Sequence, residues 1–435
     1  MTRKKRTEQI HGASTMTGGD RIRRKFRYVD RAFILSMLTV FQLVSFIPVI
    51  FSDDKVYFKI ILQLLFYISF EWFYVGVMRI FVKKVNFELE FIAFFLSGIG
   101  LCLTASVNKD SMLKQLITVM AGIIVYDILL WYLQDIKRVM FIRTPLAVFA
   151  LLFLGVSFVY IRLFVGPING AYNWLSFGGF SLQPSEFVKI AFVFVGAASL
   201  DKLLSSKNIY MFIIFAMGCI GVLFLMKDFG TALIFFFTFI VISFMRSGDL
   251  RTIVFICAIA LLGALLIIYF RPHVAARFAS YRHVWEDIYG RGYQQTRVLI
   301  YSVSGGLFGV GIGNGCLRNV YASTTDLVFG LICEEMGIFI GVIIVVAFAS
   351  IAIYAMISSR SAPSTFYSIS ACSAAAMILF QTCLNIFGIT DLLPLTGVTL
   401  PFISQGGSSM ICTWALFAFI KAADVRAYPK IYKTN

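Results

Sequence analysis

The chain has 435 residues, of which 59% are hydrophobic and only 14% are charged, and its mean hydropathy is +0.86. These values exclude a soluble globular domain of this size and indicate a polytopic membrane protein. The formal net charge of +16 does not indicate nucleic-acid binding, because the basic residues lie in short segments between apolar runs, as in the cytoplasmic loops of membrane proteins.

The chain begins with a strongly basic segment. Residues 1–31 contain ten Lys or Arg residues and no apolar core of a signal peptide. We interpret them as a cytosolic tail that fixes the orientation of the protein and contacts anionic lipid. The cysteines and histidines show neither a disulfide framework nor the spacing of a zinc site.

Twelve apolar runs follow, each read as a membrane span because about 20 apolar residues cross the hydrocarbon core. They cover roughly 32–52, 56–82, 88–106, 111–134, 143–164, 185–201, 209–226, 230–246, 251–270, 326–356, 366–387 and 399–420. The predicted fold is therefore all-α, with about 12 transmembrane helices. With the first tail inside, every predicted inside loop is basic, and the second tail, 421–435, is also cytosolic.

Three predicted outer connections are long or irregular. They are 165–184, the large loop 271–325 between the ninth and tenth helices, and the segment from Gly388 into the last helix. Because polar, Gly-rich and Pro-rich material gathers on this one side, we expect the functional site there.

The first outer connection leads into a helix with Pro184 in its first turn. Glu186 and Lys189 are three residues apart and share one face of that helix. They are either an ion pair that orients helices or a site in which Lys189 anchors phosphate. Farther on, Asp228 either caps the next helix at a tight turn or takes part in function.

The large outer loop is basic and aromatic. Its arginines, among them Arg277, bind either an anionic head group or anionic lipid along an interfacial helix. The Gly-rich stretch 304–315 has no phosphate-loop ending, and its glycines predict close backbone approach in a re-entrant loop.

Asp326 is predicted to open the tenth helix, with Glu334 and Glu335 farther along it. A carboxylate there is either a capping group or a functional group that is costly to keep at a membrane helix. The two prolines and three glycines of 393–409 predict an irregular entry into the last helix. Such backbone is tolerated at membrane depth where it lines a cavity, so we expect a cavity between this segment and the Asp326 helix.

These motifs resemble, in order, those of the SEDS family of cell-wall enzymes, the RodA, FtsW and SpoVE type. The matching pieces are Gly170-Ala171-x-x-Trp174-Leu175, Gln183-Pro184-Ser185-Glu186-x-x-Lys189, Asp228-x-Gly230-Thr231-Ala232, Gly292-Tyr293-Gln294, Ser304-Gly305-Gly306-Leu307-x-Gly309-x-Gly311-x-Gly313-Asn314, Thr325-Asp326, Glu334-Glu335-x-Gly337 and Leu400-Pro401-Phe402-x-Ser404-x-Gly406-Gly407-Ser408-Ser409. Any one piece is weak, but the ordered set is specific.

The resemblance implies a peptidoglycan glycosyltransferase that polymerises lipid II at the outer face of the bacterial cytoplasmic membrane, with both termini in the cytosol. It implies Asp326 as the catalytic base and a class B penicillin-binding protein as partner, besides membrane lipids. The substrate-binding residues that it implies are Lys189, Glu186, Trp174, Asp228, Arg277, Glu335, Ser404 and Ser408. No cofactor is required by the motifs, although a divalent cation, Mg or Mn, would help to offset diphosphate charge.

Some positions depart from the family pattern. Thr324 replaces a histidine, Gln405 replaces a tyrosine and Asn173 replaces an arginine. The family has ten spans, so we divide the chain into the tail 1–31, N-terminal membrane helices 32–142, a catalytic membrane core 143–420 and the tail 421–435. Two other functions stay open: a transporter or flippase of the lipid-linked precursor, and a non-catalytic scaffold of the division machinery.

Overall fold

A computed structural model of the protein describes residues 31–52, 55–81, 86–167, 170–177, 180–200, 206–249, 251, 254, 257–258, 281–290 and 292–424. The chain divides into two units, Met1–Val44 and Ser45–Asn435. The described part of the first unit is only the beginning of one helix. The contacts given below all lie within the second unit.

The described residues form an all-helical structure apart from one short antiparallel hairpin, as predicted. The elements are α3 (Arg31–Ile50), α4 (Phe58–Phe81), α5 (Glu88–Val107), α6 (Ser111–Leu133), α7 (Ile136–Tyr160), the π-helix η2 (Ile161–Val165), β1 (Leu175–Phe177), β2 (Phe180–Leu182), α8 (Pro184–Ser199), α9 (Ser206–Leu225), α10 (Phe229–Ser247), α13 (Tyr293–Ser304), the 3-10 helix η3 (Leu317–Asn319), α14 (Val328–Glu335), α15 (Ile338–Arg360), α16 (Thr365–Ile389) and α17 (Gly407–Ala422). In the hairpin, Leu175 pairs with Leu182 and Phe177 with Phe180.

Eight of the described helices are long and apolar enough to cross a membrane, namely α3 to α7, α10, α15 and α16. Shorter apolar helices include α9, from Tyr210 onward, and α17. Apart from 326–356 and 399–420, each predicted span coincides with one helix, except the one at 251–270, which lies mostly outside the described residues. The protein is therefore a multi-pass membrane protein.

The prediction of one continuous helix over 326–356 is wrong. Helix α14 ends at Glu335 and α15 begins at Ile338. Between them Gly337 has a φ of 86°, and a β-carbon on it would lie 2.3 Å from the carbonyl oxygen of Leu307. Hydropathy does not reveal this break, because apolar residues lie on both sides of it. The predicted span 399–420 likewise becomes helical only at Gly407.

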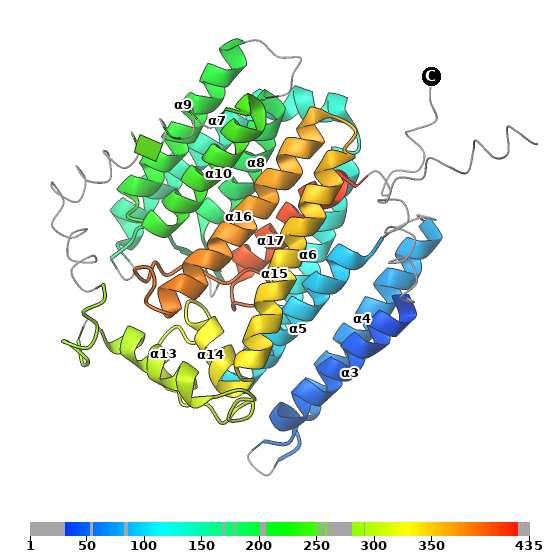
Figure 1. The fold of residues 1–435 in the computed structure, drawn as a ribbon, viewed down its shortest axis with the longest axis vertical. Helices are drawn as coiled ribbons and strands as arrows, with labels where there is room; N and C mark the ends of the chain where they lie inside the picture. The colour runs from blue at the N-terminus through cyan, green and yellow to red at the C-terminus, as the bar shows by residue number, and fades with distance from the viewer. Residues whose placement is uncertain are drawn as a thin grey trace, which may run out of the picture. The chain divides into compact units, whose positions relative to one another are not determined.

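Helix α17 forms the centre of the second unit and packs against α6, α8 and α16 (Figure 1). The Trp414 ring is 1% exposed and lies 5.7, 5.8 and 5.4 Å from the rings of Phe94, Tyr126 and Phe402. In contrast, α7 and α15 expose large apolar side chains along much of their length. An apolar exposed face is expected where a helix borders lipid.

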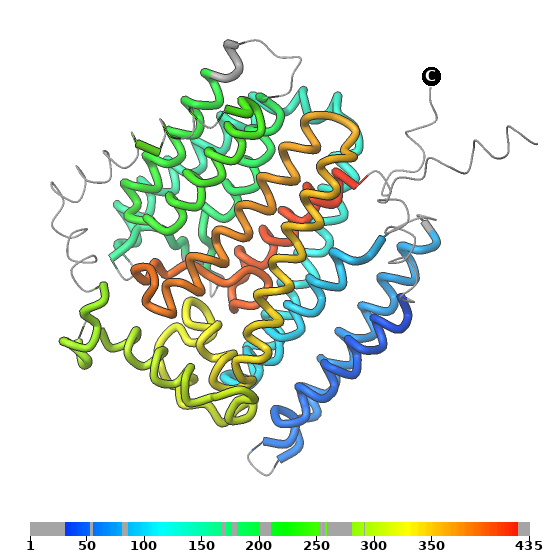
Figure 2. Tube along the Cα trace, in the orientation of Figure 1, coloured from blue at the N-terminus to red at the C-terminus, as the bar shows by residue number. Residues whose placement is uncertain are grey.

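Helices α13 and α14 lie together at one end of the bundle, beside the irregular segment 390–406 that follows α16 (Figures 1 and 2). The predicted large loop 271–325 thus contains a helix, α13, that hydropathy did not reveal.

The predicted close approach of the Gly-rich stretch is confirmed, because the N–H of Val310 donates to the carbonyl oxygen of Glu334 at 2.9 Å. A β-carbon on Gly309 would lie only 2.3 Å from the carbonyl oxygen of Glu335. No residue with a side chain fits there without a shift of the backbone.

Candidate active site

Asp326 lies in a turn just before α14 rather than at the first position of a helix. The N–H of Leu327 and that of Thr325 both donate to the carbonyl oxygen of Ala322, at 3.1 Å each. Ala322 itself has a φ of 64°, in the left-handed region. The turn therefore depends on contacts from elsewhere in the chain, since this conformation is unfavourable for alanine.

Three consecutive carbonyl groups of this turn are bonded to distant residues. The carbonyl oxygen of Thr324 accepts from the Gln405 N–H at 2.8 Å, and that of Thr325 accepts from Ser404 Oγ at 2.6 Å. The carbonyl oxygen of Asp326 accepts from Asn385 Nδ2 at 2.9 Å. Helix α16 and the segment before α17 therefore fix the backbone from which the Asp326 carboxylate projects.

A side-chain contact adds to these backbone bonds. Thr324 Oγ1 donates to Gln405 Oε1 at 2.9 Å. These two residues are the positions where the sequence departs from the family's histidine and tyrosine, so the two replacements contact each other.

The Asp326 side chain is half-buried and lines a cavity of about 480 Å³. Burial raises the pKa of Asp326 to about 6, although a hydrogen bond from Thr325 opposes the shift. A carboxyl group with this pKa is ionised at neutral pH and is a stronger base than an exposed aspartate.

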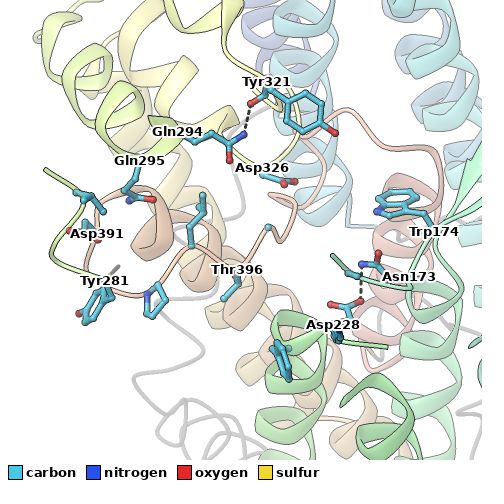
Figure 3. Close-up of a pocket in the computed structure, with 17 residues that line it drawn as sticks. Asn173, Trp174, Asp228, Tyr281, Gln294, Gln295, Tyr321, Asp326, Asp391 and Thr396 are labelled. Atoms are coloured by element: carbon cyan, nitrogen blue, oxygen red, sulfur yellow. Dashed lines mark hydrogen bonds between the residues drawn. The ribbon is translucent and has the colours of Figure 1, made fainter. Parts of the chain in front are cut away.

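The cavity joins segments that are far apart in the sequence. Figure 3 shows Asp326 facing the cavity from one side, with Asn173, Trp174 and Asp228 across from it. The lining comprises Ala171, Asn173, Trp174, Lys227, Asp228, Phe229, Tyr281, Val284, Gln294, Gln295, Tyr321, Asp326, Asp391, Pro394, Leu395, Thr396 and Gly397. The predicted cavity between the irregular segment and Asp326 is thus present.

Two of the predicted substrate-binding residues line this cavity, namely Trp174 and Asp228. Asp228 Oδ1 accepts from the Thr231 N–H at 3.2 Å, which confirms the predicted cap of α10. Its other carboxylate oxygen accepts from Gln183 Nε2 at 3.0 Å and from Asn173 Nδ2 at 3.4 Å. Asp228 therefore joins the hairpin region to α10 at the cavity wall.

Lys189 and Glu186 lie outside the cavity lining, in the interior. Lys189 is 1% exposed, and its Nζ lies 2.7 Å from both Glu186 Oε1 and Gln381 Oε1. Gln381 Nε2 then donates to the carbonyl oxygen of Thr399 at 2.9 Å, and Thr399 Oγ1 lies 2.8 Å from Ser409 Oγ. The pair thus connects α8 and α16 to the segment before α17, whose residues bond to the Asp326 turn. Direct contact of Lys189 or Glu186 with substrate stays a prediction.

The other predicted site residues have supporting contacts or lie outside the described residues. Ser404 holds the Asp326 turn, and Ser408 Oγ accepts from the Gln183 N–H at 3.3 Å. Glu335 Oε2 accepts from Ser106 Oγ at 3.2 Å. Arg277 lies outside the described residues. For these residues too, binding of substrate stays a prediction.

Glu334, which the motif pairs with Glu335, has a clear structural role. Its carboxylate accepts from the N–H groups of Cys316 and Leu317 at 2.7 and 2.9 Å. It therefore ties α14 to the beginning of η3 and to the end of the Gly-rich stretch.

Several lining residues were not identified from the sequence. Gln294 Nε2 donates to the carbonyl oxygen of Tyr321 at 3.2 Å, and the Tyr281 hydroxyl donates to that of Leu392 at 2.7 Å. Gln294 belongs to a motif and could have been proposed, whereas nothing in the local pattern marks Tyr281 or Asp391 as lining the same cavity as Asp326.

The cavity has three aspartates, but within the described part of the chain no three His, Cys, Asp or Glu side chains converge to hold a metal. A divalent cation brought with substrate phosphates stays a prediction.

Comparison with known proteins shows the family. The profile of the FtsW, RodA and SpoVE group, described as cell cycle protein, matches residues 102–428. Stage V sporulation protein E of Bacillus subtilis is 35% identical over 253 residues, which are 56% of this chain and 68% of that protein. The probable peptidoglycan glycosyltransferase FtsW of Buchnera aphidicola is 30% identical over 314 residues, which are 68% of this chain and 79% of that protein.

Solved structures confirm the fold. A chain described under "Structural coordination of polymerization and crosslinking by a peptidoglycan synthase complex" has a TM-score of 0.65 at 22% identity, covering 79% of this chain and 98% of that one. The Rod shape determining protein RodA of Thermus thermophilus has a TM-score of 0.57 at 22% identity, with 78% and 95% covered. With its ordered motifs, its matching sequence and its matching helical fold, this chain belongs to the FtsW, RodA and SpoVE family.

Proposed function

We propose that this protein polymerises lipid II into peptidoglycan glycan strands, with Asp326 as the general base. The observation that carries the proposal is the half-buried Asp326 carboxylate on the wall of a 480 Å³ cavity, with its backbone bonded on both sides. Relatives named peptidoglycan glycosyltransferases support the reaction class.

The proposed step needs one proton acceptor and one leaving group. Asp326 takes the proton from a hydroxyl of the acceptor sugar, whose oxygen then forms a bond to the anomeric carbon of the donor. The bond from that carbon to the diphosphate oxygen breaks, and the polyprenyl diphosphate leaves with the electron pair. The cavity orients the two sugars, which is where most of the rate gain of a bimolecular transfer arises.

The membrane placement is part of the proposal. Because the predicted inside loops are basic, we place both termini in the cytosol and the Asp326 cavity at the outer face of the cytoplasmic membrane. One similar structure belongs to a complex that couples polymerisation to crosslinking. We therefore propose a class B penicillin-binding protein as the partner.

An assay of the purified protein tests the proposed function. The protein, with and without a candidate penicillin-binding partner, receives labelled lipid II, and the products are sized on a gel. We expect polymer from the native chain and none from Asp326→Ala. Asp391→Asn, which changes another aspartate of the same cavity, is the control and should make polymer.

Two outcomes would contradict this proposal in different ways. Equal polymer from the native chain and Asp326→Ala removes Asp326 from the mechanism. No polymer with any partner would favour transport of the precursor or a scaffold role instead.

The contact between Thr324 and Gln405 gives a second prediction. Thr324→Val and Gln405→Leu should each lower kcat about fivefold, since a neutral hydrogen bond contributes roughly 1 kcal/mol. The double variant should be no worse than either single variant, because both changes remove the same bond. The measurement is the rate of lipid II polymerisation at saturating substrate.

The matched control for these variants is Thr390→Val, because the Thr390 hydroxyl donates to carbonyl groups in the last turns of α16, those of Ile386 and Phe387. It should leave kcat unchanged. Multiplying effects in the double variant, or a change in KM alone, would show that the pair does not position Asp326.

A further inference from the structure

Lys227 is a lining residue of the cavity to which the motifs gave no role. It lies in the turn between α9 and α10, next to Asp228. Among the lining residues that the structure describes, Lys227 is the sole lysine or arginine, and three aspartates accompany it. A substrate with a negatively charged group would therefore find its cationic partner in this part of the cavity at Lys227.

The backbone at Lys227 adopts a conformation that favours glycine. Its φ is 61°, and the turn is closed by bonds from the Lys227 N–H to the carbonyl oxygen of Phe224 and from the Asp228 N–H to that of Leu223, at 3.1 and 3.0 Å. Glycine would adopt this conformation without steric cost, and lysine does not. A strained residue at a cavity wall is an observation from which a function can be inferred.

The Lys227 ammonium is not used by the neighbouring carboxylate. The Asp228 oxygens accept from Thr231, Gln183, Asn173 and Ser185. None of the ion pairs within the described part of the chain includes Lys227. Its Nζ instead lies 5.7 Å from the centre of the Tyr172 ring, a contact that orients the side chain and leaves its hydrogen-bond donors available.

Tyr172 is itself fixed to the same turn. Its N–H donates to the carbonyl oxygen of Met226 at 2.9 Å, so the backbone of Tyr172 is bonded to the turn that carries Lys227. The positive charge of Lys227 therefore lies at the part of the cavity wall that is formed by the α9–α10 turn and the segment that leads to Trp174.

We propose that Lys227 binds the diphosphate of a lipid-linked sugar substrate in the Asp326 cavity. This inference rests on the proposed function for the sugar, and on the geometry alone for the phosphate. An ammonium group suits phosphate as a compact charge with three donors. Lys189, which the sequence offers as a phosphate anchor, is buried against Glu186 and Gln381 and lines no part of the cavity.

The kinetic effect follows from the charge of the diphosphate. Because that group is already anionic before the reaction, Lys227 contacts it in the ground state as well as in the transition state. Loss of such uniform binding raises KM more than it lowers kcat. We expect KM for lipid II to rise about tenfold in Lys227→Gln, as is typical for one charge-assisted hydrogen bond, and kcat to change less than about threefold.

Direct binding tests the site without any catalysis. The probe is undecaprenyl diphosphate added to the full-length protein in lipid nanodiscs, with undecaprenol as the uncharged comparison. Lys227→Gln and Lys227→Gly should each weaken diphosphate binding about tenfold, and Lys227→Arg should stay within about threefold of the native chain. Undecaprenol binding should not change in any variant.

Lys227→Gly separates binding from folding. Glycine removes the charge but suits the left-handed backbone, so its melting temperature should equal or exceed that of the native chain while diphosphate binding falls. Lys109→Gln is the matched control, since Lys109 lies in the loop between α5 and α6, has its Nζ 3.6 Å from the centre of the Tyr57 ring and does not line the cavity. It should bind diphosphate normally.

Native diphosphate affinity in both Lys227→Gln and Lys227→Gly would overturn the proposal, and so would an equal loss of undecaprenol binding. These outcomes are distinguishable from failure of the proposed function. A native chain that binds diphosphate through Lys227 but makes no polymer keeps the phosphate site and removes the polymerase. If Lys227→Gln polymerises lipid II with an unchanged KM, the polymerase function stands and the phosphate site at Lys227 is removed.

Discussion

The value of kcat/KM for lipid II should fall about tenfold for each pH unit below about 6. At neutral pH, the Asp326→Asn substitution should lower kcat/KM by at least about 100-fold. The physical reason is that only the ionised carboxylate accepts a proton. Burial raises the pKa of Asp326 to about 6, so the protonated, inactive form dominates below that pH and the ionised form above it. The activity is therefore present at neutral pH and lost as the pH falls.

The measurement is a pH profile of initial polymerisation rates from pH 4.5 to 8. Asp391→Asn is the matched variant, because Asp391 lines the same cavity and its φ of 56° is one that asparagine tolerates well. It should keep the midpoint near 6. A profile that is flat to pH 4.5 in the native chain, or one whose midpoint moves in Asp391→Asn, would assign the ionisation to another group.

Replacing Lys189 by methionine should destabilise the protein by about 3–5 kcal/mol. The change leaves the Glu186 carboxylate buried without its cation, and it removes the hydrogen bond that Lys189 Nζ donates to Gln381 Oε1. Because Gln381 bonds to Thr399, the loss should reach the segment that carries Ser404. The measurement is the melting temperature of the purified protein in detergent, followed by intrinsic fluorescence.

The double variant Glu186→Gln with Lys189→Met should recover most of this stability, since removing both charges of a buried pair is often close to neutral. Lys59→Met is the control, because its ion pair with Asp110 is exposed at 58% and 89% and should contribute little. A stable Lys189→Met variant with a raised KM would instead support the predicted contact between Lys189 and substrate.

Some of the site follows from local spacing. Glu186 and Lys189 are three residues apart on one helix, which predicts a shared face, and the structure places their charged atoms 2.7 Å apart. The same spacing does not say what the pair faces. Only the packing of α8 on α16 brings Gln381 to Lys189, and neither residue lines the cavity.

The close approach of the Gly-rich stretch was likewise predicted, but not the groups it approaches. Hydropathy gave one helix over 326–356, because an apolar run records burial in lipid and not the direction of the backbone. At the break, Gly337 has a φ of 86°, and a β-carbon there would lie 2.3 Å from the carbonyl oxygen of Leu307, so the need for glycine comes from a contact between segments 30 residues apart in sequence.

For this protein, then, composition and periodicity determined the membrane class, nearly every helix and the unusual carboxylate Asp326, since these depend on the chain's own apolar runs and on the cost of a charge beside them. The tertiary structure decided the site. It brought Asn385, Ser404 and Gln405 onto the three carbonyl groups around Asp326, and it placed Lys227 in the same cavity. Such contacts join residues far apart in the chain, and no local pattern specifies which of them meet.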